Sequence, residues 1–252
     1  MPKNSPDHAG GHPGSRDRMP VVRVPAGLVV LVGPPASGKT SFVRALVERR
    51  QIEAEAVVSS DEIRAELLGA SCESAPAVSD SAASDSAVSD SDSADPDSAD
   101  SDAADARIFE ERDRRIAARL TAGRSVIAES TNVTPQARAR LIAIARRFDA
   151  PVTVLRFDPD VTDLLQQYTE RGRADMTAAD VRSYAAVMSR DAGTDRIRSE
   201  GADAVHEVPG RRQAITPAEA AARFSFERLP AGVRRWPAPS PGATGTGDLT
   251  DR

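Results

Sequence analysis

Alternating buried strands and amphipathic helices predict an α/β protein, a three-layer sandwich with a mostly parallel sheet. Residues 28–32 read LVVLV, a continuous and largely β-branched run that is typical of a buried parallel strand. Apolar residues then follow helical spacing over residues 39–50. Further strand and helix patterns alternate along the chain. In such sheets ligands bind at the carboxyl ends of the strands, so the residues directly after each strand are the candidates for a functional site.

The later elements follow from the same periodicities and from helix-capping signals. Gly123 marks the end of one helix, Pro135 fits the first turn of the next, and Thr177 fits an N-cap. Strands are expected near residues 56–59 and over 124–130, 151–157 and 202–208; helices are expected from about 61, over 107–120, from 135 to about 148, over 161–170 and from about 178 to 190.

Composition predicts one folded domain over residues 25–229 with disordered additions. Residues 71–106 are nearly all Ser, Ala and Asp, with ten acidic residues and no basic one, and are expected to form a disordered insertion. Residues 1–24 and 230–252 are rich in Pro, Gly and charge and are expected to be disordered tails. The chain has a net charge of −5, so the part outside the acidic segment is net positive, which suits an anionic ligand.

Several classes of protein are excluded by residue counts. The single cysteine, Cys72, cannot form a disulfide or a thiolate metal cluster within one chain. Two of the three histidines, His8 and His12, lie in the expected N-terminal tail, which removes most routes to a zinc site or a serine triad. No apolar stretch approaches the roughly 20 residues that span a bilayer, and no apolar signal core is present, so we expect a cytoplasmic protein without membrane contact.

The stretch GPPASGKT, residues 33–40, matches the P-loop pattern G-x-x-x-x-G-K-[ST] between a buried strand and a helix. Its backbone N–H groups and the helix N-terminus suit phosphate oxygens, which predicts a P-loop NTPase that binds ATP and Mg²⁺. Lys39 is expected to bridge the β- and γ-phosphates, and the Thr40 hydroxyl to hold the metal. An accidental glycine-rich turn is the alternative, and the flanking strand and helix argue against it. The expected nucleotide-binding residues are Gly33, Pro34, Pro35, Ala36, Ser37, Gly38, Lys39, Thr40 and Ser41.

A second motif, SSDEIR at residues 59–64, ends the next strand, which we expect to lie beside the P-loop strand. Asp61 is then placed to take a proton from an attacking hydroxyl, and Arg64, three residues on, to hold an anionic group of the acceptor. A capping serine followed by a surface Asp/Arg pair explains the same residues without any catalytic role.

The third strand ends in ESTN, residues 129–132. Glu129 and the following polar residues are placed to hold the Mg²⁺ water shell or to orient a substrate. The alternative is an Asx or Thr turn that leads into the helix at Pro135.

Arg171 and Arg173 lie in the sequence TERGRAD between two expected helices. Arginines at such a position suit a helical lid that neutralises the transferring phosphoryl group. A solvated basic turn is the alternative.

Together these motifs resemble those of the P-loop polynucleotide 5′-kinases, in particular the kinase module of bacterial polynucleotide kinase-phosphatases and related small ATPases of the AAA type. The resemblance covers about residues 27–208, outside the acidic segment. It implies a lysine and a hydroxyl that bind ATP·Mg²⁺, a general base at Asp61 acting on a 5′-hydroxyl, and a phosphate contact at Arg64. It also implies donor clamping by Arg171 and Arg173. Where that family usually has D-A-T-N, this chain has the longer Glu129.

The leading hypothesis is an ATP-dependent phosphotransferase that acts on a hydroxyl, most simply a nucleic acid 5′ end. A small-molecule kinase or a zeta-toxin-like kinase has the same fold, and so does an ATP-binding regulatory switch without an acceptor. The acidic segment is either a tolerated surface loop, which we favour, or an autoinhibitory mimic of a nucleic acid strand. The sequence leaves the acceptor and the oligomeric state open.

Overall fold

The computed structural model describes residues 21–73, 96–171, 177–228 and 236. A five-stranded sheet of order β3-β4-β2-β5-β6 forms its centre, and every neighbouring pair of strands is parallel. The predicted α/β fold with a mostly parallel sheet is therefore confirmed. The strands are β2 (Leu28–Val32), β3 (Val57–Ser59), β4 (Val126–Glu129), β5 (Val152–Arg156) and β6 (Ala204–Glu207).

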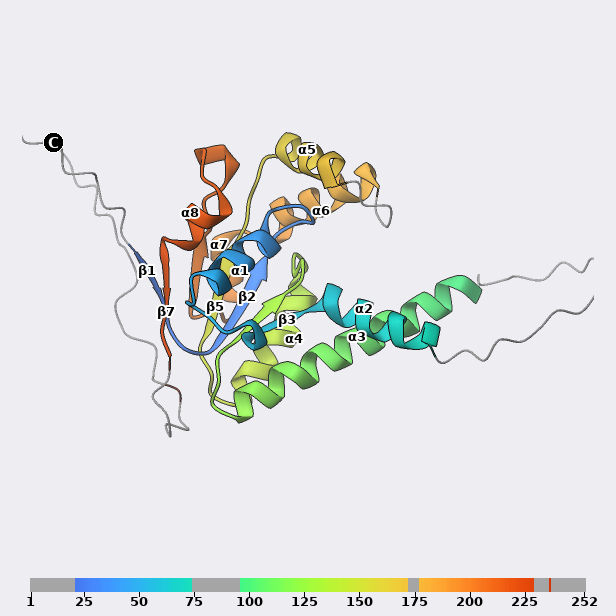
Figure 1. The fold of residues 1–252 in the computed structure, drawn as a ribbon, viewed down its shortest axis with the longest axis horizontal. Coiled ribbons are helices and arrows are strands. Elements are labelled where there is room, and N and C mark those ends of the chain that lie inside the picture. The colour runs from blue at the N-terminus through green and yellow to red at the C-terminus, as the bar shows by residue number, and fades with distance from the viewer. Residues whose placement is uncertain (1–20, 74–95, 172–176, 229–235, 237–252) are drawn as a thin grey trace, which may run out of the picture.

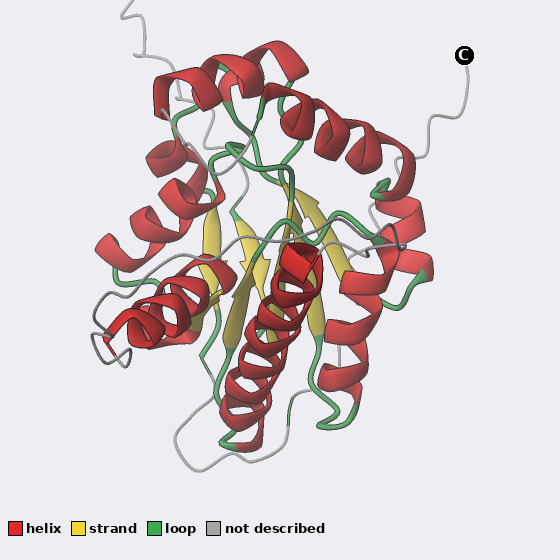
Figure 2. Ribbon diagram, turned by 90° about the vertical axis from the view of Figure 1, so that its right-hand side faces the viewer, coloured by secondary structure: helices red, strands yellow, loops and turns green. Residues whose placement is uncertain are grey.

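Helices cover both faces of this sheet (Figure 2). Helices α5 and α6 pack against each other beside the end of the sheet where α1 begins (Figure 1). The helices are α1 (Lys39–Glu48), α2 (Ser60–Glu73), α3 (Pro96–Thr121), α4 (Pro135–Arg146), α5 (Val161–Arg171), α6 (Ala178–Asp191), α7 (Thr194–Ser199) and α8 (Pro217–Ala221), with short 3₁₀ turns at Ala54–Ala56 and Arg211–Gln213. Among the described residues, no helix is both long and apolar enough to cross a membrane.

The strand β2 shows why the fold has three layers. Leu28, Val30 and Val32 pack into a core with α3, α4 and α6 on one face of the sheet. Val29 and Leu31 pack into a second core with α1 and α8 on the other face. A strand that is buried on both faces has no polar side, which explains the continuous apolar run in the sequence.

Two predicted helix starts are capped by side chains, at Thr177 as expected and at Thr134, which was not predicted as a cap. The Thr134 hydroxyl accepts a hydrogen bond from the Ala137 amide at the start of α4, with Pro135 in the first helical position. At the start of α6, Thr177 and Asp180 form a reciprocal capping box. Both residue pairs satisfy amide groups that the first helical turn leaves without a partner.

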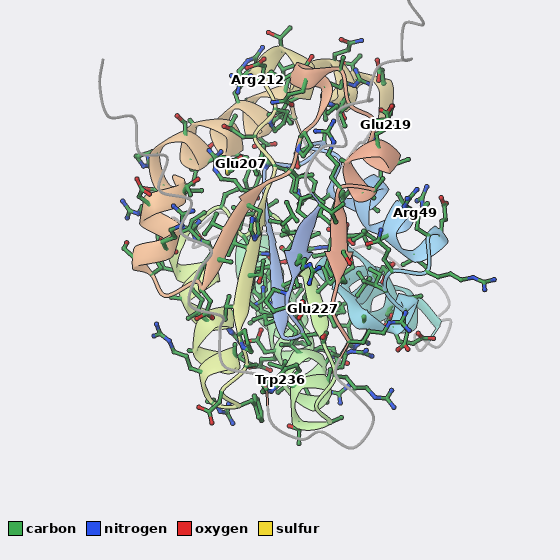
Figure 3. The ribbon with its side chains drawn as sticks, turned by 90° about the vertical axis from the view of Figure 1, so that its left-hand side faces the viewer. Arg49, Glu207, Arg212, Glu219, Glu227 and Trp236 are labelled. Carbon is green, nitrogen blue, oxygen red and sulfur yellow. The ribbon has the colours of Figure 1, made fainter. Side chains whose placement is uncertain are left out.

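The expected N-terminal tail of residues 1–24 is wrong at its end, because Val22–Val24 forms strand β1. This strand pairs in parallel with β7 (Phe224–Phe226), and Figure 1 shows the two side by side. Trp236, which the sequence places in a C-terminal tail, is buried in the core of the α3–α4 face. It lies at the opposite end of the sheet from Glu207 and Arg212 (Figure 3). The β1–β7 pairing and the packing of Trp236 join segments that are far apart in the chain. Neither segment is long enough to show a local sequence pattern.

The expected disordered insertion over residues 71–106 also needs a boundary correction. Helix α2 continues to Glu73 and α3 begins at Pro96, well before the predicted start at residue 107. Proline is favoured in the first helical turn, and the aspartates that follow it suit the positive end of a helix. Residues 74–95 lie outside the described part of the chain.

Candidate active site

The loop between β2 and α1 has the backbone form that phosphate binding needs. A side chain at Gly33 would lie 2.9 Å from the Phe157 carbonyl oxygen, so only glycine fits there. Gly38 has φ 91° and Ala36 has φ 62°, both in the left-handed region. Helix α1 begins at Lys39, directly after the loop. The loop therefore leads directly into the N-terminus of α1, which is where a P-loop binds phosphate.

The Lys39 side chain is held over this loop by the loop's backbone carbonyl groups. Its ammonium group donates to the carbonyl oxygens of Gly33 and Pro34, both at 2.8 Å, and to the Ser37 hydroxyl at 3.3 Å. The side chain is 8% exposed. Phosphate oxygens are charged acceptors, so they can replace those carbonyl oxygens as partners of the ammonium group.

Thr40 and Glu129 form the contact between the P-loop and its neighbouring strand. The Thr40 hydroxyl donates to Glu129 Oε1 at 2.5 Å. Glu129 is buried at the end of β4, which lies directly beside β2 in the sheet. Burial raises the pKa of this carboxyl; the Thr40 hydrogen bond and the Lys39 charge oppose the shift, and the nearby charges of Glu62 and Asp61 add to it.

The strand that leads to Asp61 is not the neighbour of the P-loop strand, so that prediction was wrong. Strand β4 lies between β3 and β2, because the chain returns to the centre of the sheet after α3. Asp61 still lies near the site: Ser59 of β3 is the register partner of Glu129, and the Asp61 charge acts on the Glu129 carboxyl. The carboxylate beside the Thr40 hydroxyl is therefore Glu129, with Asp61 farther along the same edge.

The contacts of SSDEIR are those of the capping alternative, and the catalytic role of this motif stays a prediction. The Ser59 hydroxyl accepts a hydrogen bond from the Glu62 amide at 3.4 Å, as a helix cap does. Arg64 projects from the first turns of α2 and pairs with Asp105 of α3 at 2.6 Å, with 47% of the Arg64 side chain exposed. The guanidinium that was predicted to bind an acceptor anion therefore already holds a carboxylate from the acidic segment.

The turn after Glu129 is attached to the P-loop by its backbone. The Gly33 amide donates to the Thr131 carbonyl at 2.9 Å, and the Asn132 side-chain amide donates to the Leu31 carbonyl at 2.9 Å. Asn132 has φ 46°, a left-handed conformation that Asn tolerates better than most residues. The Asn132 side-chain oxygen is buried and accepts no hydrogen bond within the described part of the chain, so Asn132 forms no Asx turn, and the site role of the segment stays a prediction.

A pocket of about 550 Å³ opens beside the P-loop and was not predicted. Its walls come from the start of α1, the loop after β5 and the loop after β6, and its size suits a nucleoside. Arg211 and Arg212 in the loop after β6 pair with Glu170 and Asp160 of the α5 segment, at 3.2 and 3.1 Å. Figure 3 shows Arg212 at the same end of the sheet as Glu207. The run PGRR directly after the last strand was the available signal, since loops at strand carboxyl ends carry ligands.

The structure describes the backbone of only one of the two predicted lid arginines. Arg171 is the last residue of α5, but its side chain is outside the described set. Arg173 lies outside the described residues altogether. Their donor-clamping role stays a prediction.

The oxygen atoms present fit Mg²⁺ bound together with a triphosphate. Thr40 and Glu129 bring a hydroxyl and a carboxylate to the same point, and both are hard ligands of the kind that Mg²⁺ takes. Among the described residues, no group of three or more His, Cys, Asp or Glu side chains could hold a metal ion unaided. Mg²⁺ usually binds through one or two protein groups plus phosphates.

The fold and the site together define a P-loop nucleotide-binding protein with a kinase-like α/β fold. Residues 28–190 match the family model AAA_33, an AAA domain, and the chain belongs to that family. No curated protein matches the chain.

Solved structures share the fold at low sequence identity. A protein from Chloroflexus aurantiacus that is named as a kinase has a TM-score of 0.51 at 16% identity, over 78% of this chain and 92% of that one. A chain of the Pnkp1/Rnl/Hen1 RNA repair complex has a TM-score of 0.47 at 18% identity, over 69% of this chain and 46% of that one. A gluconokinase from Sinorhizobium meliloti has a TM-score of 0.46 at 16% identity, over 79% of this chain and 89% of that one.

Proposed function

We propose that this protein is an ATP-dependent phosphotransferase that moves the γ-phosphoryl group of ATP to a hydroxyl. One observation carries the proposal: the P-loop lysine, the Thr40–Glu129 pair and the Asp61 charge meet at one edge of the sheet. This combination supplies a phosphate cradle, a metal ligand and a separate carboxylate. A phosphotransferase needs all three at one place.

The donor nucleotide is proposed to lie along the N-terminus of α1. The triphosphate replaces the carbonyl contacts of Lys39, and the nucleoside enters the pocket between the loops after β5 and β6. Ser37 and Ser41 lie on the pocket wall and continue the P-loop towards it. The P-loop and the pocket therefore form one continuous site for a nucleoside triphosphate.

Thr40 and Glu129 are the residues proposed to hold Mg²⁺, Thr40 directly and Glu129 directly or through a metal-bound water. Bound there, the ion would neutralise charge on the β- and γ-phosphates. Lys39 would add a second positive charge near the transferring group.

In the proposed transfer, the acceptor oxygen attacks the γ-phosphorus and the bond from that phosphorus to the β–γ bridging oxygen breaks, which leaves ADP. Asp61 takes the proton of the attacking hydroxyl, because it is an exposed carboxylate at the same edge of the sheet as Glu129. Arg171 and Arg173 are proposed to stabilise the charge of the transferring group.

A nucleic acid 5′-hydroxyl is the acceptor we propose first, with Arg64 holding a phosphate of the strand. The Arg64–Asp105 pair favours the second candidate, a small-molecule kinase, because Asp105 opposes any anion at Arg64. A nucleic acid substrate should bind with strong salt dependence, whereas a small uncharged alcohol should not.

The test is transfer of labelled γ-phosphate to a panel of 5′-hydroxyl oligonucleotides, tRNA and small alcohols, with wild type and Asp61→Asn. We expect transfer to one class of acceptor and a loss of about 100-fold or more in Asp61→Asn, with ATP binding unchanged. Glu53→Gln, an exposed carboxylate at the start of the 3₁₀ turn before β3, is the control and should be neutral. ATP binding without transfer to any acceptor would identify a regulatory switch and end the proposal.

A further inference from the structure

Arg138 of α4 is a buried arginine whose contacts all lie outside its own helix. Its side chain is 1% exposed and donates five hydrogen bonds. Two go to the carbonyl oxygens of Asn132 (3.1 Å) and Val133 (2.7 Å), one goes to the Asp191 carbonyl (2.7 Å), and two go to the Glu200 carboxylate (2.7 Å each). A buried guanidinium is costly unless all its donors are paired, and here they are paired with three separate segments.

The first of these segments is the turn after Glu129. The left-handed Asn132 is held from one side by its own bond to the Leu31 carbonyl and from the other by Arg138. A residue in this conformation persists only where its surroundings determine it, and such residues gather at functional sites. The same turn receives the Gly33 amide through Thr131, so its position sets one wall of the P-loop.

The other two segments are the ends of α6 and α7. Asp191 is the last residue of α6, where carbonyl groups lack helical partners, and Glu200 is the C-cap of α7. The neighbouring Ala192 carbonyl is held by Arg156 from the end of β5 at 2.7 Å. The end of α6 is thus held by Arg138 of α4 and by Arg156 of β5, and the Glu200 carbonyl at the end of α7 also accepts a bond from Arg146 of α4 at 3.5 Å. Of these three guanidinium groups, only Arg138 is also bonded to the turn.

We propose that Arg138 is a positioning residue: it fixes the turn at residues 129–133 against the P-loop, and through that turn it sets the place of Glu129 beside Thr40. The inference rests on the proposed function in one respect, that Thr40 and Glu129 hold Mg²⁺ with ATP. The five side-chain hydrogen bonds of Arg138 go to neither the P-loop nor Glu129, and Arg138 does not line the pocket. Its loss should therefore change the Mg²⁺ requirement and leave the affinity for metal-free ATP unchanged.

The main variant is the double substitution Arg138→Met/Glu200→Leu, because it removes both charges and leaves none buried alone. Binding of a fluorescent ATP analogue is measured with and without Mg²⁺, so no acceptor is needed. We expect the Mg²⁺ concentration for half-maximal binding to rise about tenfold, as for other groups that orient metal ligands, and the metal-free affinity to stay within about twofold. Arg138→Lys, which keeps a charge near Glu200 but lacks the planar fork, should fall between wild type and the double variant and serves if the double variant does not fold.

Two controls separate positioning from general stability. Arg112→Met removes another buried arginine, 2% exposed, whose bonds go to Asp113 and not to the turn. Glu200→Gln leaves the Arg138 bonds to Asn132 and Val133 in place. Both should lower the melting temperature without moving the Mg²⁺ midpoint.

A folded double variant or Arg138→Lys with the wild-type Mg²⁺ midpoint would overturn the inference. So would an equal shift in Arg112→Met. Failure of the proposed function looks different, because wild type would then bind the analogue with Mg²⁺ dependence yet transfer phosphate to no acceptor.

Discussion

The proposed donor side and the proposed acceptor side of the site are held together by different kinds of contact. On the donor side the P-loop backbone, the buried Lys39 and the Thr40–Glu129 pair are fixed by short hydrogen bonds inside the protein. On the acceptor side α2 and α3 are joined by exposed ion pairs, Arg64–Asp105 at 2.6 Å and Arg115–Glu66 at 2.5 Å. Buried, hydrogen-bonded groups are organised before a ligand arrives, whereas exposed pairs exchange readily with solvent, salt and ligands.

This difference indicates where changes should act. Substitutions on the donor side should alter the chemical step and metal binding by large factors. Substitutions on the acceptor side should alter acceptor affinity by small, salt-dependent factors. The three predictions below run from the largest expected effect to the smallest.

Lys39→Ala should cause the largest loss. Removing a charge aimed at the transferring phosphoryl group costs about 100- to 1,000-fold in rate, so we expect phosphate transfer to fall by that factor. The rate with labelled ATP measures it. A variant that keeps more than a tenth of the wild-type rate would show that Lys39 does not face the γ-phosphate.

The same residue offers an independent check, since Lys3 and Lys39 are the only lysines in the chain. ATP·Mg²⁺ should protect Lys39 from an amine-reactive ester. Lys3, far outside the P-loop in sequence, should react equally with and without ATP and serves as the internal reference. Peptide mass spectrometry reads both sites.

Glu129→Gln should weaken ATP·Mg²⁺ binding about tenfold or more while it stabilises the protein at neutral pH. Burial raises the pKa of Glu129 above its ordinary value of 4.5, so the folded protein binds this proton more tightly than the unfolded chain does. The free energy of unfolding of wild type therefore loses this contribution as pH rises from the ordinary Glu range through the raised pKa. Glutamine can still accept the Thr40 hydrogen bond but does not titrate. The variant should therefore not lose unfolding free energy over this pH range.

Denaturant unfolding tests the predicted effect on stability, and ATP·Mg²⁺ titration tests the predicted effect on binding. Both are measured between pH 4 and pH 8, about the range in which carboxyl groups and histidines titrate. Wild-type binding should weaken on acidification at a pH above the ordinary Glu range, and Glu129→Gln should lack that step. If the variant unfolds more easily than wild type at neutral pH, burial of a charge at Glu129 is not the controlling effect.

Asp105→Asn should have the smallest effect, on the acceptor side only. Freed from its partner, Arg64 should bind an anionic acceptor more tightly, and the KM for a 5′-hydroxyl oligonucleotide should fall about two- to fivefold at low salt with kcat unchanged. High salt should remove the difference. Asp195→Asn, another exposed carboxylate with an arginine partner, is the matched control. An equal change in both variants would show a general charge effect and no competition at Arg64.

Short contiguous motifs were predictable because their geometry is local. The P-loop needs only residues 33–40 and the strand and helix on either side, and Pro135 and Thr177 lie at the starts of the helices that they signal. Arg64 shows the limit of this reasoning. Its spacing from Asp61 was visible in the sequence, but its ion-pair partner Asp105 lies 41 residues away and could not be predicted. The start of α3 was missed for a related reason, since its composition alone indicated disorder.

By itself, the sequence determined a parallel α/β sheet, a phosphate-binding loop and the residues that stand at the carboxyl ends of its strands, because each depends on neighbours along the chain. Only the tertiary structure decided the strand order that puts Glu129, and not Asp61, beside Thr40. It also decided the β1–β7 pairing and the five contacts of Arg138. These depend on which distant segments pack together, and packing is set by the fit of whole surfaces, which no local period encodes.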